Sequence, residues 1–322
     1  MIITRTPFRI SFAGGGSDLK SFYKKNRYGF VISAAIQKYM YIVIHPYFHN
    51  KIRLKYSVTE DVNDVSQINH PIIRECLKKV KIENGIEIAS FADIPSGSGL
   101  GSSSSFTVGL LNALYAYNGS QVSKKKLAKE ACEIEIDILG APIGKQDQYA
   151  AAFGDLNSIR FFRDETVEIN PLSLSESRTR KLENKICLYF TGGKRNANNI
   201  LFEQRSNMAD EKIFSNMKKL VKLAEISKDT FIKGDLTDIG RVLHDGWELK
   251  KSFAKSITND KINKLYNLFI KNGAIGGKLL GAGEEGFLLI YADDHDKFNE
   301  AYGTSSFPLK IDKQGTKIIF NE

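Results

Sequence analysis

The chain has 322 residues, enough for two ordinary domains, each with its own core. Its hydrophobic content of 42% and charged content of 26% are typical of a soluble globular protein, and no apolar run reaches the roughly twenty residues of a membrane-spanning helix. The N-terminal residues lack the order of a signal peptide, and the three widely spaced cysteines fit neither a disulfide framework nor a zinc site. We therefore expect a cytoplasmic protein without a membrane partner.

The net charge of +9 raises the question of a nucleic-acid partner. The lysines are scattered along the chain, which is typical of solvated helix faces rather than of one binding block. A protein that binds doubly phosphorylated ligands would show the same excess, so the charge alone does not decide.

In chain order, the first half begins with strands and continues with helices. The expected strands cover residues 2–13, 30–36, 39–45, 52–57 and 85–94. Helices are expected near 71–80, over 106–117, and over 123–139 with Ser123 as the N-cap. Pro142 ends the last of these, and another helix begins near Gln146. Two short strands, 156–162 and 165–170, follow.

The polar segment 173–184 is the expected domain boundary, which gives domains of residues 1–180 and 181–322. The second half begins with a strand at 185–192 and continues with several helices between Asn196 and Asn272. It closes with strands at 276–282 and 286–292, a helix near 294–301 and two short strands. This order of elements predicts an α+β fold.

The segment SGSGLGSSSS, residues 96–105, contains only glycine and serine apart from Leu100. Such runs are more often linkers, but this one joins an apolar, β-prone run directly to an apolar helix. Small residues there let backbone N–H groups approach a ligand, and the helix turns the positive end of its dipole towards it. We therefore expect a phosphate-binding turn.

Two further glycine-rich segments lie at residues 12–18 and 273–287, and none of the three fits the Walker A pattern. In this order and at these separations, PFRISFAGGGSD, IPSGSGLGSSSS and GGKLLGAGEEGF resemble motifs one, two and three of the GHMP small-molecule kinases. That superfamily is named for galactokinase, homoserine kinase, mevalonate kinase and phosphomevalonate kinase. The resemblance extends from Arg5 to about Tyr291.

The resemblance implies a two-domain fold, with a ribosomal-S5-like N-terminal domain and a ferredoxin-like C-terminal domain, and it implies ATP and Mg²⁺ as cofactors. LHDGWELKKS followed by GAIGGKLLGAG is similar to sugar kinases that act at an anomeric hydroxyl. The implied acceptor is D-glycero-D-manno-heptose 7-phosphate, converted to the 1,7-bisphosphate for nucleotide-activated heptose and hence for capsule or lipopolysaccharide precursors. An unphosphorylated sugar such as fucose is the alternative acceptor.

Phosphoryl transfer needs positioned phosphates, a divalent cation, and a group that orients or deprotonates the acceptor hydroxyl. By resemblance, ATP binds the glycine-serine loop, which comprises Pro95, Ser96, Gly97, Ser98, Gly99, Leu100, Gly101, Ser102, Ser103 and Ser104. Asp147 in GKQDQ matches the catalytic aspartate of the family, and Arg9 in PFR matches the basic residue beside it. Without the resemblance, Asp147 is an acidic residue at a helix N-terminus and Arg9 a charge on a strand edge.

The resemblance also implies that Ser103 and Glu135 are the metal ligands. Glu135 borders the apolar stripe of its expected helix on the side of Ala128, whereas the neighbouring acidic residues point elsewhere. The alternative is an ordinary solvated charge on a helix.

The implied acceptor contacts come from three segments, and they are Gly15, Gly16, Ser17, Asp18, Lys194, Arg195 and Gly283. Galactokinases have a Glu-His pair where this chain has Gly15-Gly16, so only Asp18 is retained as a ligand for a sugar hydroxyl. Lys194 and Arg195 follow a strand end and precede a helix, which suits a phosphate on the acceptor, although a solvated loop is the alternative. Glu284 and Glu285 replace glycines of motif three, and we expect their side chains to point to solvent. The sequence does not decide whether the backbone of motif three comes close to the phosphates.

Two rival functions remain open. One is a catalytically silent binding or regulatory member of the fold, against which the joint retention of Arg9, Ser103, Glu135 and Asp147 argues. The other is nucleic-acid binding by the first domain. We expect a sugar phosphate and ATP as the partners, no nucleic acid, and a monomer or homodimer.

Overall fold

Two β-sheets organise the computed structural model, which describes residues 1–192, 197–302 and 306–322. The first sheet has the strand order β12-β1-β2-β5-β3-β4 with β6 and β7 added beside β2, and the second has the order β11-β8-β10-β9. Strands of the first sheet are β1 (Ile2–Ala13), β2 (Tyr28–Pro46), β3 (Ile52–Lys55), β4 (Thr59–Val62), β5 (Ile86–Ala92), β6 (Leu156–Phe162), β7 (Val167–Pro171) and β12 (Lys317–Asn321). Those of the second are β8 (Ile186–Phe190), β9 (Ala274–Leu279), β10 (Phe287–Ala292) and β11 (Ser306–Pro308).

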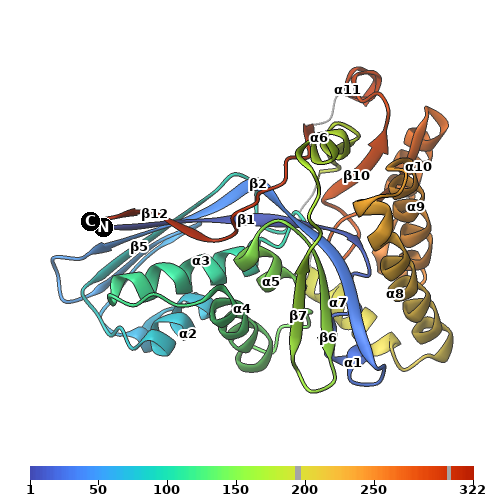
Figure 1. The fold of residues 1–322 in the computed structure, drawn as a ribbon. Helices are drawn as coiled ribbons and strands as arrows, with labels where there is room; N and C mark the ends of the chain where they lie inside the picture. The colour runs from blue at the N-terminus through green and yellow to red at the C-terminus, as the bar shows by residue number, and fades with distance from the viewer. Residues whose placement is uncertain (193–196, 303–305) are drawn as a thin grey trace.

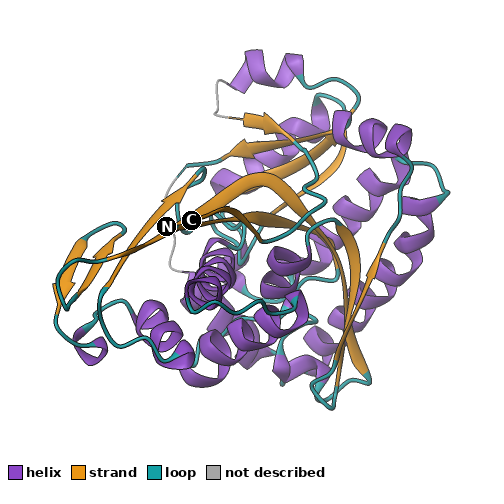
Figure 2. Ribbon diagram, turned by 60° about the vertical axis from the view of Figure 1, so that its left-hand side comes forward, coloured by secondary structure: helices purple, strands orange, loops and turns teal. Residues whose placement is uncertain are grey.

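The helices pack against the two sheets (Figure 1, Figure 2). Beside the first sheet are α2 (Pro71–Val80), α3 (Ser102–Tyr117), α4 (Lys124–Cys132) and α5 (Gln146–Phe153). Along the other end of the molecule run α8 (Glu211–Ile232), α9 (Thr237–Lys251) and α10 (Asp260–Lys271). The remaining helices are α1 (Lys20–Tyr23), α6 (Glu176–Asn184), α7 (Ala197–Asn207) and α11 (Asp296–Tyr302). The predicted α+β class is confirmed.

Strand β2 corrects the sequence analysis, which expected two strands with a break near Gln37. The structure has one strand of 19 residues, and its register with β1 shifts between Pro7 and Phe8. The polar residues Gln37 and Lys38 lie at this shift. The backbone N–H of Gln37 donates to the carbonyl of Lys310 instead of to β1, so the strand continues through the shift. The polar residues Gln37 and Lys38 interrupt the apolar pattern in the sequence, and the long-range pairing carries the strand through them.

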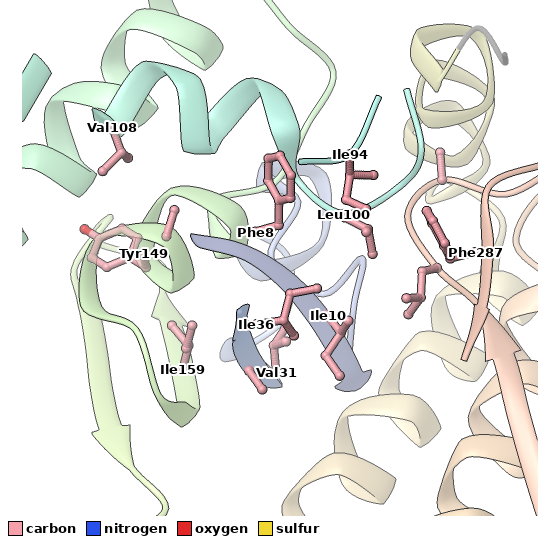
Figure 3. Close-up of a cluster of buried hydrophobic side chains, with 14 of the residues drawn as sticks. Phe8, Ile10, Val31, Ile36, Ile94, Leu100, Val108, Tyr149, Ile159 and Phe287 are labelled. Carbon is pink, nitrogen blue, oxygen red and sulfur yellow. The ribbon is translucent and has the colours of Figure 1, made fainter. Parts of the chain in front are cut away.

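One hydrophobic core joins the two sheets. Figure 3 shows Phe8 and Ile10 of β1, Leu100 of the glycine-serine loop and Phe287 of β10 in the same cluster. The side chain of Leu100 is fully buried, so the loop is fixed to the core at its centre.

The chain returns to the first sheet at its end, where β12 pairs antiparallel with β1 through Ile2 and Asn321. The polar segment 173–184 contains helix α6, capped by Ser175, whose hydroxyl accepts the backbone N–H of Arg178 at 3.3 Å. The division into 1–180 and 181–322 stays a prediction. In the described ranges no helix has the length and apolar character needed to span a bilayer.

Candidate active site

The glycine-serine loop lies between β5 and helix α3 and has a regular backbone pattern. Gly97, Gly99 and Gly101 have φ angles of 79°, 91° and 77°, a region that L-residues rarely adopt. Glycine at every second position therefore follows from the backbone conformation, and alternation of left-handed residues is a backbone pattern that can present N–H groups to an anion. With Leu100 held in the core, the segment is an ordered turn and not a linker.

Arg9 of β1 connects the loop to helix α5. Its guanidinium donates two hydrogen bonds to the Asp147 carboxylate, from Nε to Oδ1 at 2.6 Å and from Nη2 to Oδ2 at 2.5 Å. Nη1 donates to the carbonyl of Gly99 at 2.7 Å, and the backbone N–H of Arg9 donates to the carbonyl of Leu100 at 3.0 Å. Arg9 is only 6% exposed, which excludes a simple solvated charge on a strand edge.

Asp147 lies in the first turn of α5, where the helix dipole also favours a carboxylate. A Cβ on Gly101 would lie 3.1 Å from Cγ of Arg9 and 3.2 Å from Oδ2 of Asp147. The glycine therefore lets the start of α3 approach the Arg9–Asp147 pair closely.

The implied metal ligands lie in direct contact. The Ser103 hydroxyl donates to Oε1 of Glu135 at 2.5 Å, and Nε2 of Gln148 donates to Oε2 at 2.7 Å. Glu135 is 2% exposed, and burial raises its pKa, against the lowering effect of the hydrogen bonds from Ser103 and Gln148. A buried carboxylate beside a serine hydroxyl suits Mg²⁺, which takes one or two protein oxygens and completes its shell with phosphates and water.

The backbone around Glu135 differs from the expected α-helix over 123–139. Ser123 caps α4 as predicted, accepting from the backbone N–H of Lys126 at 3.2 Å, but α4 ends at Cys132 and a π-helix follows over Glu133–Ile138. Such segments insert an extra residue per turn and change which side chains face inward. Apolar spacing alone gave no signal for it.

Two cavities meet at the Arg9–Asp147 pair. The loop cavity, of about 470 Å³, is lined by Gly97, Gly99, Gly101, Ser102, Ser103, Ser104 and Glu135. The inner cavity, of about 90 Å³, is lined by side chains that include Ser11, Asp18, Gln146, Gln204, Lys250 and Lys278. Both cavities share Arg9, Asp147, Gly281 and Ala282, so this ion pair forms part of the wall between a phosphate-type loop and a second polar compartment.

The residues of motif one divide between the inner cavity and the scaffold. Gly15, Gly16 and Asp18 line the cavity. Asp18 accepts the backbone N–H groups of Gly16 at 2.9 Å and Gln146 at 3.0 Å, and burial raises its pKa. Ser17 is different, because its hydroxyl donates to the carbonyl of Phe30 and accepts the Phe30 N–H, which makes its observed role structural.

Motif three approaches the glycine-serine loop through Gly286, whereas Gly283, expected as an acceptor contact, is not among the residues that line either cavity. Gly283 packs against Ile257, where an added Cβ would lie 2.5 Å from the Ile257 carbonyl oxygen. Gly286 makes the close approach to the loop, since its Cβ would lie 2.4 Å from the carbonyl oxygen of Ser98. Glu284 is exposed, as expected, with a φ of 66°, whereas Glu285 is half-buried.

Lys194 and Arg195 lie outside the described residues, so their proposed contact with an acceptor phosphate stays a prediction. His244 and Trp247, in contrast, pack in the core region of α9. The Nδ1 atom of His244 lies 2.7 Å from the Tyr266 hydroxyl, and Trp247 is fully buried.

Comparisons with known proteins agree with this arrangement. The family described as GHMP kinases N terminal domain matches residues 69–155, which contain the glycine-serine loop, Glu135 and Asp147. The chain is 31% identical to a D-glycero-alpha-D-manno-heptose 7-phosphate kinase of Campylobacter jejuni over 92% of this chain and 91% of that protein. The chain belongs to the GHMP kinases.

Two further relatives of this GHMP kinase are also named as kinases of sugars or sugar phosphates. A crystal structure of a D-glycero-D-manno-heptose 1-phosphate kinase from Bacteroides thetaiotaomicron superposes with a TM-score of 0.82 and 26% identity over the whole of both chains. A bifunctional fucokinase/GDP-fucose pyrophosphorylase of Arabidopsis thaliana is 26% identical over 91% of this chain and 30% of that protein. The expectation of an α+β GHMP sugar kinase is therefore confirmed in fold and enzyme class.

Sequence reasoning missed several residues of this GHMP kinase site. Gln148 holds Glu135, Lys278 lies in the wall of the inner cavity, and Gln204 closes that cavity from α7. Gln148 directly follows Asp147, and Lys278 is part of motif three, so both had a positional signal. Gln204 had none, because only the fold brings Gln204 of α7 close to Gly16.

Proposed function

We propose that this GHMP kinase transfers the γ-phosphoryl group of ATP to the anomeric hydroxyl of D-glycero-D-manno-heptose 7-phosphate, giving the 1,7-bisphosphate. The relatives' names support a heptose phosphate, and they differ in the position of the phosphate that they state. The observation that carries the proposal is the position of Asp147 between the loop cavity and the inner cavity.

In this proposal each compartment holds one reactant. The glycine-serine loop and the start of α3 bind the phosphates of ATP in the loop cavity through backbone N–H groups. Ser103 and Glu135 hold Mg²⁺, which neutralises phosphate charge when bound. The acceptor occupies the inner cavity with O1 directed at Asp147.

Asp147 acts as general base. It accepts the proton of the acceptor hydroxyl as the oxygen forms its bond to the γ-phosphorus and the bond to ADP breaks. Arg9 holds the carboxylate through two hydrogen bonds, and its charge lies where the transferred group gathers negative charge.

The test is an assay of ADP release with Mg·ATP and heptose 7-phosphate, with fucose and galactose as comparison acceptors. We expect turnover with the heptose phosphate and a second phosphate on O1, located by ³¹P NMR. Preference for a neutral sugar, or a new phosphate at another position, would overturn the proposed acceptor while leaving the kinase class in place.

A further inference from the structure

We propose that Ser11, Gln146 and Lys278 bind hydroxyl groups of the acceptor sugar. The inference rests on the proposed function, since it takes the inner cavity as the acceptor compartment. None of these three residues belongs to the acceptor contacts implied by the family resemblance, and they come from three different elements, β1, α5 and β9.

Two of the three carry a polar atom without a partner. Within the described part of the chain, Oγ of Ser11 and Oε1 of Gln146 are buried and make no hydrogen bond. An unsatisfied buried polar atom destabilises a protein, so native structures rarely keep one without a role. Both residues line the same cavity next to Asp147.

Gly15 keeps the space between these two groups open. A Cβ at Gly15 would lie 3.0 Å from Oγ of Ser11 and 3.5 Å from Nε2 of Gln146. A side chain at Gly15 would therefore occupy the space beside the Ser11 hydroxyl and the Gln146 amide.

Lys278 is the third group. Its ammonium group is buried, and weak hydrogen bonding offsets little of the cost of burying the charge. Lys278 is 6% exposed, and among the residues that the structure describes its Nζ has one long hydrogen bond, to the carbonyl of Phe12 at 3.5 Å. Lys250, in the same cavity wall, is a buried lysine with short hydrogen bonds: its Nζ donates to the carbonyls of Leu279 at 3.0 Å and Gly281 at 2.6 Å. Burial, and then the charge of Arg9, lowers the pKa of Lys278 to about 8.

The donors and acceptors of the site select hydroxyl groups over a phosphate. Lys278 can only donate, Oε1 of Gln146 can only accept, and Ser11 can do both. A sugar hydroxyl both donates and accepts, so neighbouring hydroxyls can satisfy all three atoms. A phosphate dianion has no proton for Oε1 of Gln146, and the carboxylates of Asp18 and Asp147, which line the same cavity, would repel it. The phosphate of the acceptor therefore binds outside this cluster.

Single substitutions test this with the intact enzyme. Lys278→Met and Ser11→Ala should raise the acceptor KM, by roughly 10- to 150-fold for the loss of a charged hydrogen bond and by about 2- to 12-fold for a neutral one. The KM for ATP should stay within about twofold of the wild-type value. Ser33→Ala is the matched control, since the buried Ser33 hydroxyl donates to the carbonyl of Ile10 and does not line the cavity; it should leave the acceptor KM unchanged.

A deoxy-sugar series identifies the hydroxyl involved. Removing the hydroxyl that Lys278 binds should weaken the wild-type enzyme but should not weaken Lys278→Met further. If both variants keep the wild-type acceptor KM, or if Lys278→Met raises the ATP KM instead, the inference is wrong and the proposed function stands. If the wild type phosphorylates another sugar, the heptose assignment fails, and the same comparison with that sugar still decides the inference.

Discussion

Arg9 combines roles that are often divided among several residues. It binds the Asp147 carboxylate, the Gly99 carbonyl and, through its backbone, the Leu100 carbonyl. The position of the proposed base is therefore coupled directly to the position of the phosphate loop. The motif in the sequence predicted that Arg9 and Asp147 would lie together, but not that Arg9 would also fasten the loop.

The first prediction concerns Asp147. Asp147→Asn keeps the volume of the side chain but removes its ability to accept a proton, so kcat should fall by roughly 10²-fold or more. ATP binding, measured by calorimetry, should remain close to wild type. Asp137→Asn, at a largely exposed position, is the control and should keep full turnover. Full activity of Asp147→Asn would remove this residue from the chemistry.

The second prediction concerns the stability cost of Lys278. Its pKa in the folded protein is about 8, below the ordinary value of 10.5, so the unfolded chain binds more protons between these two pH values. Wild-type stability therefore rises with pH across this window, and the destabilisation is largest below pH 8. Lys278→Met should raise Tm at pH 7, and this gain should shrink from pH 8 to pH 10.

Calorimetric melting at several pH values checks this. The charged groups that share the cavity with Lys278 are Arg9, Lys250, Asp18 and Asp147. Since these are unchanged in Lys278→Met, the difference in Tm between the two proteins isolates Lys278. A lower Tm of the variant at pH 7 would show that the lysine stabilises the fold and is not a strained functional group.

At the scale of elements, the glycine-serine loop shows what a local pattern can and cannot predict. The flanking strand and helix, and glycine as the residue of left-handed turns, follow from composition and chain order. The contact of Gly101 with the Arg9–Asp147 pair does not, because it depends on how α3, β1 and α5 pack. The π-helix around Glu135 was likewise hidden, because the apolar spacing of the sequence fits an ordinary α-helix, although Ile138 at the end of that pattern is exposed in the structure.

A third prediction concerns the close approach of Gly101 to the Arg9–Asp147 pair. Gly101→Ala combines a left-handed φ of 77° with a Cβ 3.1–3.2 Å from Arg9 and Asp147. Both the KM for ATP and kcat should suffer, with a loss in kcat/KM of at least about 10-fold. Gly119→Ala is a sharp control: its φ is 69°, but no atom lies within 4 Å of the added Cβ.

Both glycine variants carry the strain of a left-handed φ, and only Gly101→Ala adds the contacts with Arg9 and Asp147, so only this variant should lose activity. Steady-state kinetics and thermal melting of the two proteins separate the effects. Equal activity of the two variants would show that the close approach at Gly101 has no role in catalysis.

A fourth prediction addresses the hydrogen bond behind the proposed metal ligand. Gln148→Met removes the donor to Oε2 of Glu135 with little change in volume, so Glu135 should lose its fixed orientation. The Mg²⁺ concentration for half-maximal activity should rise by about 10- to 100-fold at saturating ATP. Glu133→Gln, in the same π-helix but paired with Lys79 near the surface, should not shift it.

At the scale of the whole molecule, the three motifs were sufficient for the family and the fold class. Motif one ends at residue 18, motif two spans 94–105 and motif three begins at 276, so local patterns cannot state how they meet, and the family resemblance supplied that step. The resemblance did not predict that β2 is one long strand, which depends on the register shift between Pro7 and Phe8. It also did not predict that β12 pairs with β1. Both depend on pairing between residues distant in sequence.

The fifth prediction concerns this return. Removing residues 317–322 should leave the β1 edge from Ile2 to Arg5 without its partner, which favours association with other chains. We expect a lower Tm and increased light scattering on heating. Ile319→Lys, which changes an exposed side chain but keeps the backbone pairing, should remain monodisperse and close to wild type in Tm.

The pairing of β12 with β1 also sets an order of events on the ribosome. About 300 residues separate the two strands, and at roughly 5–20 residues per second their synthesis takes about 15–60 s. Arg9, the glycine-serine loop and Asp147 all emerge in the first half of that interval. Arg9, Asp147 and the phosphate loop are therefore made while one edge of β1 is still unpaired and open to association, and the packing of Gly286 against Ser98 comes later.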